Sequence, residues 1–313
     1  MRVFSDIDAV SLDSDTAIAI GKFDGIHTGH KRLFDEVFSY REKGLKTLVF
    51  TFASSVMEYV TGRRFPSLTT NEERREICAE LKHDYLVEYP VNRETMGIEP
   101  ERFLSEILVK RLRAKAIVTG ADCSFGAGGR GNFELLKDRS TALGYEAVLV
   151  DKVIMDGQEI SSTAIRGFVE EGRMERVEKF LGHPYSIYGK VVHGRALGRK
   201  IDMPTVNINP EENKILPPFG VYESNIYLGS ERFAGLTNIG LKPTVTDKGL
   251  VTVETHIIDF DEDLYGEKLK IELLHFERPE KKFDSLNELK KQMLSDKINA
   301  VRFHKSRSGM EQL

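Results

Sequence analysis

The chain has 313 residues, of which 40% are hydrophobic and 30% charged, and its formal net charge is −4. The length predicts about two domains, and the charge predicts no nucleic-acid or membrane partner. The two cysteines, Cys78 and Cys123, lack metal-ligand spacing, so we expect free thiols in a reducing compartment. We find no apolar run long enough to span a bilayer, and the acidic residues 1–15 are unlike a signal peptide, so we expect a cytoplasmic protein.

The first half of the chain alternates the signals of strands and helices. A β-rich run at residues 16–22 precedes apolar residues at helical spacing over 31–41, and residues 45–52 form the next β-rich run. Gly44 is suited to end the intervening helix. Such a strand–helix–strand unit predicts parallel pairing with a right-handed crossover.

The same alternation continues to about residue 154. A capping box formed by Thr69 and Glu72, or by Thr70 and Glu73, predicts the start of another helix. Further on we expect strands at 85–91, 114–120 and 146–154, and helices at 101–113 and 132–143. The order predicts an open α/β sheet with ligands beyond the carboxyl ends of its strands.

The pattern changes near residues 182–186, where β-rich runs separated by Gly and Pro begin. They predict a sandwich or barrel, followed by one helix at 286–304. The β-rich runs lie at 185–192, 221–228, 251–258 and 268–276. We therefore predict two domains, residues 1–182 and 183–313.

The first candidate site lies where the first strand ends, in residues 21–30 (GKFDGIHTGH). Its glycines let the backbone approach a ligand. His27 and His30 stand at the start of a helix, whose free N–H groups and partial positive charge favour anions. Either histidine alone could be an ordinary surface residue, but this context favours a phosphate that carries transition-state charge.

Two later segments carry further polar groups. In residues 160–166 (ISSTAIR), Ser161 or Ser162 can cap a short helix, and Arg166 can bind a phosphate bidentately. Residues 120–131 (GADCSFGAGGRG) follow a strand, where ligands bind. Taken singly, these segments also fit a capped helix and a surface loop.

In their chain order, residues 21–30, then 120–131, then 160–166, the three motifs resemble the adenylyltransferase module of bacterial FAD synthetases, which are bifunctional riboflavin kinase/FMN adenylyltransferases. The resemblance implies a Rossmann-like nucleotidylyltransferase domain that binds ATP with its α-phosphate near His27 and His30. It implies direct attack by the FMN phosphate, charge screening by magnesium, and pyrophosphate held by Arg166. The other nucleotide-binding residues that it implies are Gly21, Phe23, Asp24, Gly25, Asp122, Ser162 and Thr163. The chain departs from this family at residues 51–55 (TFASS), where T-F-x-P-H-P is usual.

The second candidate site begins with a basic, glycine-spaced segment that includes Gly189, Lys190 and Gly194. Backbone N–H groups and positive charge in a β-hairpin loop suit phosphates. Thr205 and Asn207 offer oxygen ligands for magnesium.

A carboxylate follows on a later strand. Alternation places Glu254 and His256 on one face of that strand, where Glu254 can act as a general base or simply face solvent. The surrounding segments resemble the riboflavin kinase module, namely LPPFGVY at 216–222, NIGLKPT at 238–244, VETHIIDFDEDLYG at 253–266 and RPEKKF at 278–283. That resemblance implies a six-stranded antiparallel β-barrel with a terminal helix. It also implies that Glu254 activates the ribityl 5′-hydroxyl of riboflavin, with Thr205 and Asn207 holding magnesium and ATP phosphates.

Two departures from the riboflavin kinase pattern leave the function of the second domain open. Asp202 stands where the family has a glycine beside the phosphates, and Lys242 where an arginine is common. The main interpretation is a bifunctional enzyme that phosphorylates riboflavin and joins FMN to AMP, giving FAD. The alternatives are an FMN adenylyltransferase with an inactive flavin-binding barrel, and a non-enzymatic flavin-sensing regulator. No pattern predicts the oligomeric state.

Overall fold

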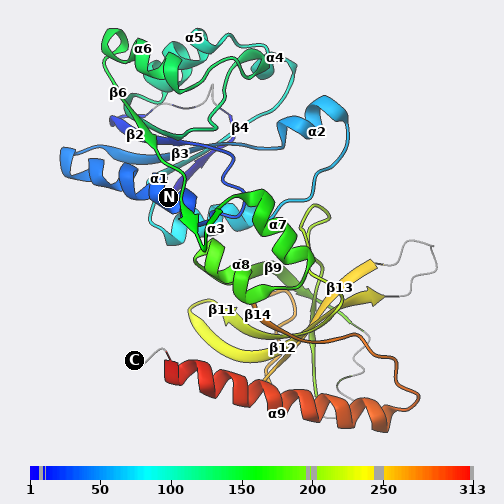
Figure 1. Cartoon of the computed structure of the whole chain (residues 1–313). Helices are drawn as coiled ribbons and strands as arrows, with labels where there is room; N and C mark the ends of the chain where they lie inside the picture. Colours follow the sequence, from blue (N-terminus) through cyan, green and yellow to red (C-terminus); the bar gives the residue numbers. More distant parts are fainter. Residues whose placement is uncertain (7–9, 11, 195–197, 199–202, 243–249, 311–313) are drawn as a thin grey trace. The chain divides into compact units, whose positions relative to one another are not determined.

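The computed structural model describes residues 1–6, 10, 12–194, 198, 203–242 and 250–310. It divides into two compact units, Met1–Ser162 and Thr163–Leu313 (Figure 1). The functional boundary expected between residues 182 and 183 stays a prediction. Asp202 lies outside the described residues, as do Pro243 and Thr244 of the NIGLKPT segment.

The first unit is built on a six-stranded parallel sheet with the strand order β1-β4-β3-β2-β5-β6. Its strands are β1 (Arg2–Phe4), β2 (Thr16–Ile20), β3 (Lys46–Phe52), β4 (Tyr85–Tyr89), β5 (Ala114–Gly120) and β6 (Glu146–Val150). Every residue of β2 is buried, because the alternate side chains of this central strand enter two separate cores. Ile18 and Ile20 pack on one face, and Ala17 and Ala19 on the other. The predicted open α/β sheet is confirmed.

Helices cover this sheet and connect its strands. They are α1 (Thr28–Ser39), η1 (Tyr40–Lys43), α2 (Val56–Thr61), α3 (Asn71–Glu80), α4 (Arg93–Met96), α5 (Pro100–Arg102), η2 (Phe103–Arg111), η3 (Ala127–Gly129) and α6 (Phe133–Leu143). Gly44 ends the α1–η1 segment with φ +79°, as predicted. Of the two capping boxes considered, the Thr70–Glu73 box is the one formed at α3.

Some elements differ from the sequence-based expectation. The helix expected at 101–113 is mostly the π-helix η2, in which the Leu112 N–H bonds to the Ile107 carbonyl five residues earlier. Apolar spacing does not distinguish i+4 from i+5 hydrogen bonding. The strand expected at 146–154 ends at Val150, and a small hairpin of β7 (Ile154–Met155) and β8 (Gln158–Glu159) follows. The edge strand β1 and helix α2 were not predicted from the sequence.

The second unit contains a closed antiparallel barrel with the order β10-β13-β12-β11-β14-β9, which confirms the predicted barrel. Its strands are β9 (Tyr185–Val192), β10 (Val206–Ile208), β11 (Gly220–Leu228), β12 (Glu231–Lys242), β13 (Leu250–Ile257) and β14 (Lys268–Pro279). Three buried hydroxyl groups form a row of hydrogen bonds inside the barrel: Ser224 with Thr237 at 2.8 Å, and Thr237 with Thr255 at 2.9 Å. The terminal helix α9 (Leu286–Met310) packs on β12 through Leu236 and Ala300.

The helices α7 (Ser162–Glu170) and α8 (Met174–Leu181) precede the barrel. Helix α8 contacts β14 and β9. Glu175 of α8 bonds to His275 at 2.5 Å, and Glu178 pairs with Arg307 of α9. These contacts join α8 to the barrel rather than leaving it a free linker. None of the helices within the described ranges is long and apolar enough to cross a membrane.

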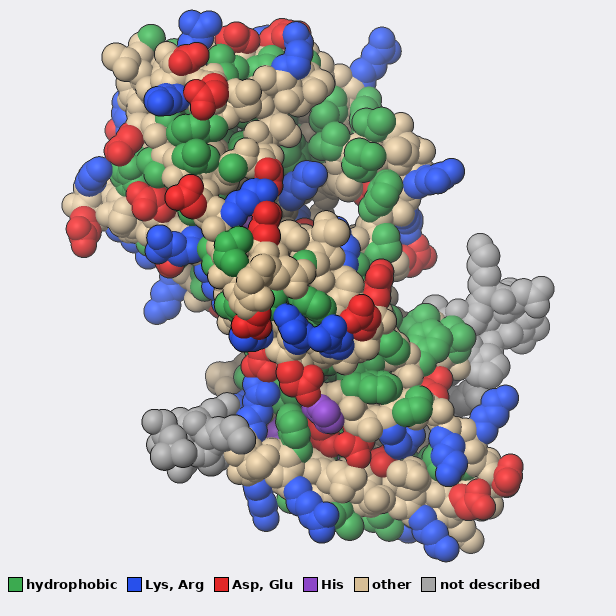
Figure 2. Space-filling view, viewed as in Figure 1, with side chains coloured by type: hydrophobic (Ala, Val, Ile, Leu, Met, Phe, Trp, Pro, Cys, Tyr) green, Lys and Arg blue, Asp and Glu red, His purple; other side chains and the backbone are tan. Residues whose placement is uncertain are grey.

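Hydrophobic side chains gather at the surface around α2 (Figure 2). Met57, Tyr59 and Val60 are 46–69% exposed, and Phe65 beyond the helix is 40% exposed. This helix follows directly on residues 51–55, where the chain departs from T-F-x-P-H-P. Ser55 at its start donates its N–H to Glu58 at 3.4 Å. A capped helix therefore begins directly after the segment that departs from the T-F-x-P-H-P pattern.

His83 is a buried histidine beneath α1. Its ring stacks on Phe38 at 4.5 Å and meets the edge of Phe34 at 4.6 Å, and it is 2% exposed. Both ring nitrogens lack a hydrogen-bond partner among the described residues. Burial lowers the pKa of His83 to about 4, with a smaller contribution from Arg41. The folded protein therefore favours the neutral ring.

We expect His83→Phe to reduce the acid sensitivity of the first unit. The pKa of an unfolded histidine is about 6.5, so stability due to the neutral ring is complete above that pH and is lost as pH falls toward the folded value. The loss is about 2 kcal/mol at about pH 5. Urea unfolding at about pH 7 and about pH 5 measures it. His193→Phe, at an exposed position of the second unit, controls for the loss of a histidine elsewhere in the chain. An equal acid-induced loss in wild type and His83→Phe would contradict the expectation.

Candidate functional sites

The two histidines of the first site are stacked at the start of α1. Their ring centroids are 3.6 Å apart with an interplanar angle of 15°. His27 is the N-cap residue, and its Nδ1 accepts the backbone N–H of His30 at 3.3 Å. Gly29 leaves space for this ring, since a Cβ there would lie 3.1 Å from it. The H-x-G-H spacing thus produces one compact imidazole pair.

Burial favours the neutral form of both rings. It lowers the pKa of His27 to about 4. Burial, followed by the charge of His27, lowers the pKa of His30 well below its usual value. Because Nδ1 of His27 is an acceptor, the hydrogen-bond pattern assigns its proton to Nε2. The His27 ring can therefore donate a hydrogen bond to an anion, and a bound phosphate would favour protonation of both rings.

Several other predicted residues of the first unit belong to the loop that leads to these histidines or contact it. Phe23 meets the edge of the His30 ring at 5.1 Å. A Cβ at Gly21 would lie 2.9 Å from the Phe23 ring, so this glycine permits the tight loop. The Ser162 hydroxyl donates to the Asp24 carbonyl at 2.8 Å, which joins the SSTAIR motif to the loop.

Three further predicted residues of this site are Asp122, Thr163 and Arg166. Asp122 follows the end of β5, the strand beside β2, and pairs with Lys152 at 2.8 Å. Thr163 and Arg166 lie on α7 in the second unit. The assignment of these residues to nucleotide binding stays a prediction.

In the barrel, three polar residues form a row across neighbouring strands. The register pairs Glu254 of β13 with Asn207 of β10 on one side and with Asn238 of β12 on the other. Directly paired residues of antiparallel strands place their side chains on the same face. Glu254 therefore lies between two amide side chains. As predicted, His256 shares its face, because both residues line one cavity.

Two cavities lie at this face of the barrel, and Thr205 and His256 line both. The smaller, about 240 Å³, contains Glu254 and Asn238. Its apolar lining consists of Val221, Leu236, Phe283, Leu289 and Met293. The larger, about 640 Å³, has a polar rim formed by Asp259, Asp261, Glu262, Asp263 and Lys297. Two ligands can therefore meet where the cavities adjoin.

Of the two residues predicted to hold magnesium, Thr205 lines both cavities, and Asn207 is paired with Glu254 on the neighbouring strand. Asn207 is 5% exposed, and its Oδ1 has no hydrogen-bond partner among the described residues. Gly194 packs against it so closely that a Cβ would lie 2.3 Å from Nδ2. A buried amide oxygen without a hydrogen-bond partner among the described residues is the kind of hard oxygen ligand that magnesium prefers. Within the described ranges, no group of three or more His, Cys, Asp or Glu side chains is arranged to hold a metal.

Gly189 and Lys190 lie in β9 rather than in a loop. A Cβ at Gly189 would lie 3.1 Å from Ile208, so this glycine permits close packing with β10. Val191 is the β9 residue that lines the larger cavity. The roles of Gly189 and Lys190 in phosphate binding stay predictions.

The structure adds cavity residues to which the sequence analysis gave no role. Arg278 binds Asp296 of α9 through both carboxylate oxygens, with Nη2 to Oδ2 at 2.7 Å. Asn238 contacts Glu280 at 3.5 Å. These residues close the smaller cavity between barrel and helix. Arg278 and Glu280 belong to the quoted RPEKKF segment, but no local pattern identifies Asp296.

Comparison with known proteins matches both units to enzyme families. A family model described as FAD synthetase matches residues 10–164, and one described as riboflavin kinase matches residues 181–304. The first range contains His27 and His30, and the second contains Glu254 and both cavities.

Similar proteins match nearly the whole chain. Bifunctional riboflavin kinase/FMN adenylyltransferases of Escherichia coli K12 and Listeria monocytogenes are 35% and 33% identical, over 91% and 93% of this chain and 92% and 93% of theirs. A solved Streptococcus pneumoniae structure, titled a macrolide-efflux protein, matches with a TM-score of 0.82 and 28% identity, covering 95% of this chain and 97% of that one. On the family models and these relatives together, the chain belongs to the bifunctional riboflavin kinase/FMN adenylyltransferase family.

Proposed function

We propose that this chain phosphorylates riboflavin to FMN in its barrel and joins FMN to the AMP portion of ATP in its first unit, giving FAD. The observation that carries this proposal is that each family match contains its own site, the stacked imidazole pair or the Glu254 row. A match to both families favours the bifunctional interpretation over a single activity or a regulator. A cytoplasmic location and the absence of a nucleic-acid partner stay predictions.

In adenylyl transfer, a phosphate oxygen of FMN attacks the α-phosphorus of ATP. The new P–O bond forms as the bond to the β-phosphate oxygen breaks, and pyrophosphate leaves. His27 donates a hydrogen bond from Nε2 to the α-phosphate, and the backbone N–H groups at the start of α1 donate further ones. Catalysis then depends on positioning and on stabilising negative charge, without a covalent enzyme intermediate.

In the kinase reaction, the smaller cavity suits the flavin ring, because an apolar lining faces a polar row. ATP would take the larger cavity, and its phosphates would need a bound cation there, because the rim carries four carboxylates and one lysine. Glu254 accepts the proton of the 5′-hydroxyl as the oxygen attacks the γ-phosphorus, and ADP leaves. Thr205 and Asn207 would hold magnesium, which supplies charge neutralisation at the phosphates when bound.

We predict that His30→Ala lowers FMN-to-FAD conversion by about 10²–10³, the scale for losing one electrostatic stabiliser. Chromatography of flavin products with FMN, ATP and magnesium measures it. His30→Gln, which keeps an N–H donor, should retain more activity than Ala. Riboflavin phosphorylation in the same sample is the control and should persist. Normal FAD formation by His30→Ala would exclude this role.

Glu254→Gln should lower the rate of riboflavin phosphorylation by a factor of about 10²–10⁴, the range for loss of a general base. The amide keeps the size of the side chain but cannot take the proton. Conversion of FMN to FAD should continue, which shows that the protein is folded. Glu231→Gln, at an exposed carboxylate where β12 begins, is the matched control. If both variants phosphorylate riboflavin at the wild-type rate, Glu254 is not the base.

A further inference from the structure

The loop that leads into the histidine pair has an unfavourable backbone. Phe23 and Ile26 have φ values of +48° and +43°, and Gly25 between them has +89°. Both nonglycine residues are fully buried, with 0% exposure. A β-branched residue such as Ile26 rarely adopts this region, so the surrounding structure must hold it there. Ile26 directly precedes His27, and the loop conformation therefore determines where the α1 N-cap lies.

Thr69 holds this loop through two reciprocal hydrogen bonds. Its hydroxyl oxygen accepts the Gly25 N–H at 2.9 Å, and its own N–H donates to Asp24 Oδ1 at 3.1 Å. Thr69 is 5% exposed, so little water is available to replace these bonds. Both bonds reach the loop between its two strained nonglycine residues.

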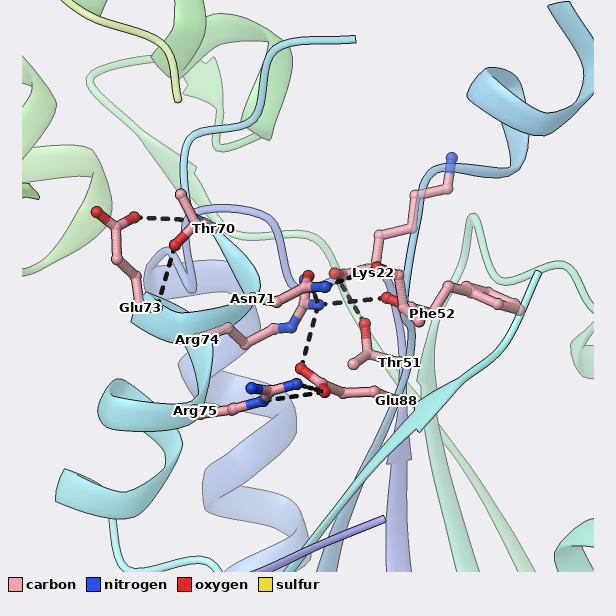
Figure 3. Close-up of polar contacts among 10 residues, drawn as sticks. Lys22, Thr51, Phe52, Thr70, Asn71, Glu73, Arg74, Arg75 and Glu88 are labelled. Atoms are coloured by element: carbon pink, nitrogen blue, oxygen red, sulfur yellow. Dashed lines mark hydrogen bonds and ion pairs between the residues drawn. The ribbon is translucent and has the colours of Figure 1, made fainter. Parts of the chain in front are cut away.

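Thr69 directly precedes the start of α3, which several hydrogen bonds hold in place. The next residue, Thr70, begins α3 with its capping box to Glu73. In Figure 3, Arg74 reaches the Phe52 carbonyl at 3.2 Å and Asn71 Oδ1 at 2.5 Å. The buried Arg74 guanidinium also lies 3.8 Å from the Glu88 carboxylate of β4, measured from Nη2 to Oε1. The start of α3 is therefore fixed to the ends of β3 and β4.

The same strand end contacts the loop directly. The Thr51 hydroxyl donates to the Lys22 carbonyl at 3.0 Å (Figure 3). Asn71 Nδ2 donates to the Ala53 carbonyl at 2.7 Å. The Gly21–Ile26 loop is thus held at Lys22 from β3, and at Asp24 and Gly25 from Thr69.

We propose that Thr69 is a positioning residue for adenylyl transfer, acting through Asp24 and Gly25 on the His27–His30 pair. This proposal rests on the proposed function of the first unit. Thr69 does not contact the histidines in any bond described above, so its effect must pass through the loop backbone. Small misplacements of groups that stabilise charge cost more in the transition state than in ground-state binding.

The test is Thr69→Val, which keeps the shape of the side chain and removes the acceptor for the Gly25 N–H. We expect kcat for FMN-to-FAD conversion to fall about 10- to 100-fold, while KM for ATP changes less than about threefold. Thr69→Ser restores the hydroxyl and should return kcat to within about threefold of wild type. Riboflavin phosphorylation should be unchanged in every variant.

The matched control is Thr47→Val at the other end of β3. Thr47 is fully buried, and its hydroxyl accepts the Asp84 N–H at 3.0 Å and Arg41 Nη2 at 3.1 Å and donates to Asp84 Oδ2 at 2.8 Å. Because Thr47→Val removes more hydrogen bonds than Thr69→Val, we expect it to lose at least as much stability but to keep its kcat. An equal fall in kcat at Thr47→Val, or no rescue by Thr69→Ser, would show general destabilisation and overturn the proposal.

The remaining outcomes are also informative. Wild-type kcat in Thr69→Val, with FAD made by both proteins, overturns the positioning role and leaves the proposed function intact. Absence of FAD formation by the wild type would instead overturn the proposed function. If Thr69→Val does not fold, Thr69→Cys replaces it, because a thiol is a weak acceptor of similar size. An intermediate kcat in Thr69→Cys would support the role, and a wild-type kcat would overturn it.

Discussion

The parallel pairing of β2 with β3 and β5 is the constraint on which the first unit depends. Ile20, the last residue of β2, is paired with Phe50 on one side and Thr119 on the other. Parallel strands end at the same edge of a sheet, so three loops distant in sequence meet there. Burial of β2 on both faces leaves its register little freedom. The histidine pair, the α3 start and the Asp122 loop all take their positions from this arrangement.

Burial also sets the chemistry of the histidine pair. Two charged imidazoles with centroids 3.6 Å apart would repel each other strongly at a poorly hydrated site. Burial lowers the pKa of both histidines, so the two rings do not carry a charge at the same time near neutral pH. A phosphate bound beside the pair would act in the opposite direction, because an anion favours the charged form of the rings.

The barrel uses antiparallel register for a similar purpose. Pairing of β10, β13 and β12 places Asn207, Glu254 and Asn238 in one row, although they are far apart in sequence. Helix α9 then supplies Leu289 and Met293 to the cavity lining. The clamp between Arg278 and Asp296 holds that helix at the end of β14. The position of the polar row and the closure of the cavity thus depend on different elements of the same unit.

Much of this organisation could be predicted from the sequence, because local signals carry it. Hydrophobic period indicated the parallel sheet and the β-rich second half, and residues 21–30 pointed to the phosphate site. The choice between the Thr70–Glu73 capping box and its alternative needed the structure, since both spacings are equivalent locally.

Only the tertiary structure decided which distant groups meet. The bonds of Thr69 to Asp24 and Gly25 span 45 and 44 positions, and no sequence period encodes them. The neutrality of His27 and His30 depends on burial by residues from other elements. The π-helix η2 likewise needed backbone geometry, because its apolar spacing resembles that of an α-helix. The sequence by itself determined the types of element and the candidate chemical groups, whereas long-range packing determined their contacts and charge states, because both depend on neighbours that chain order does not reveal.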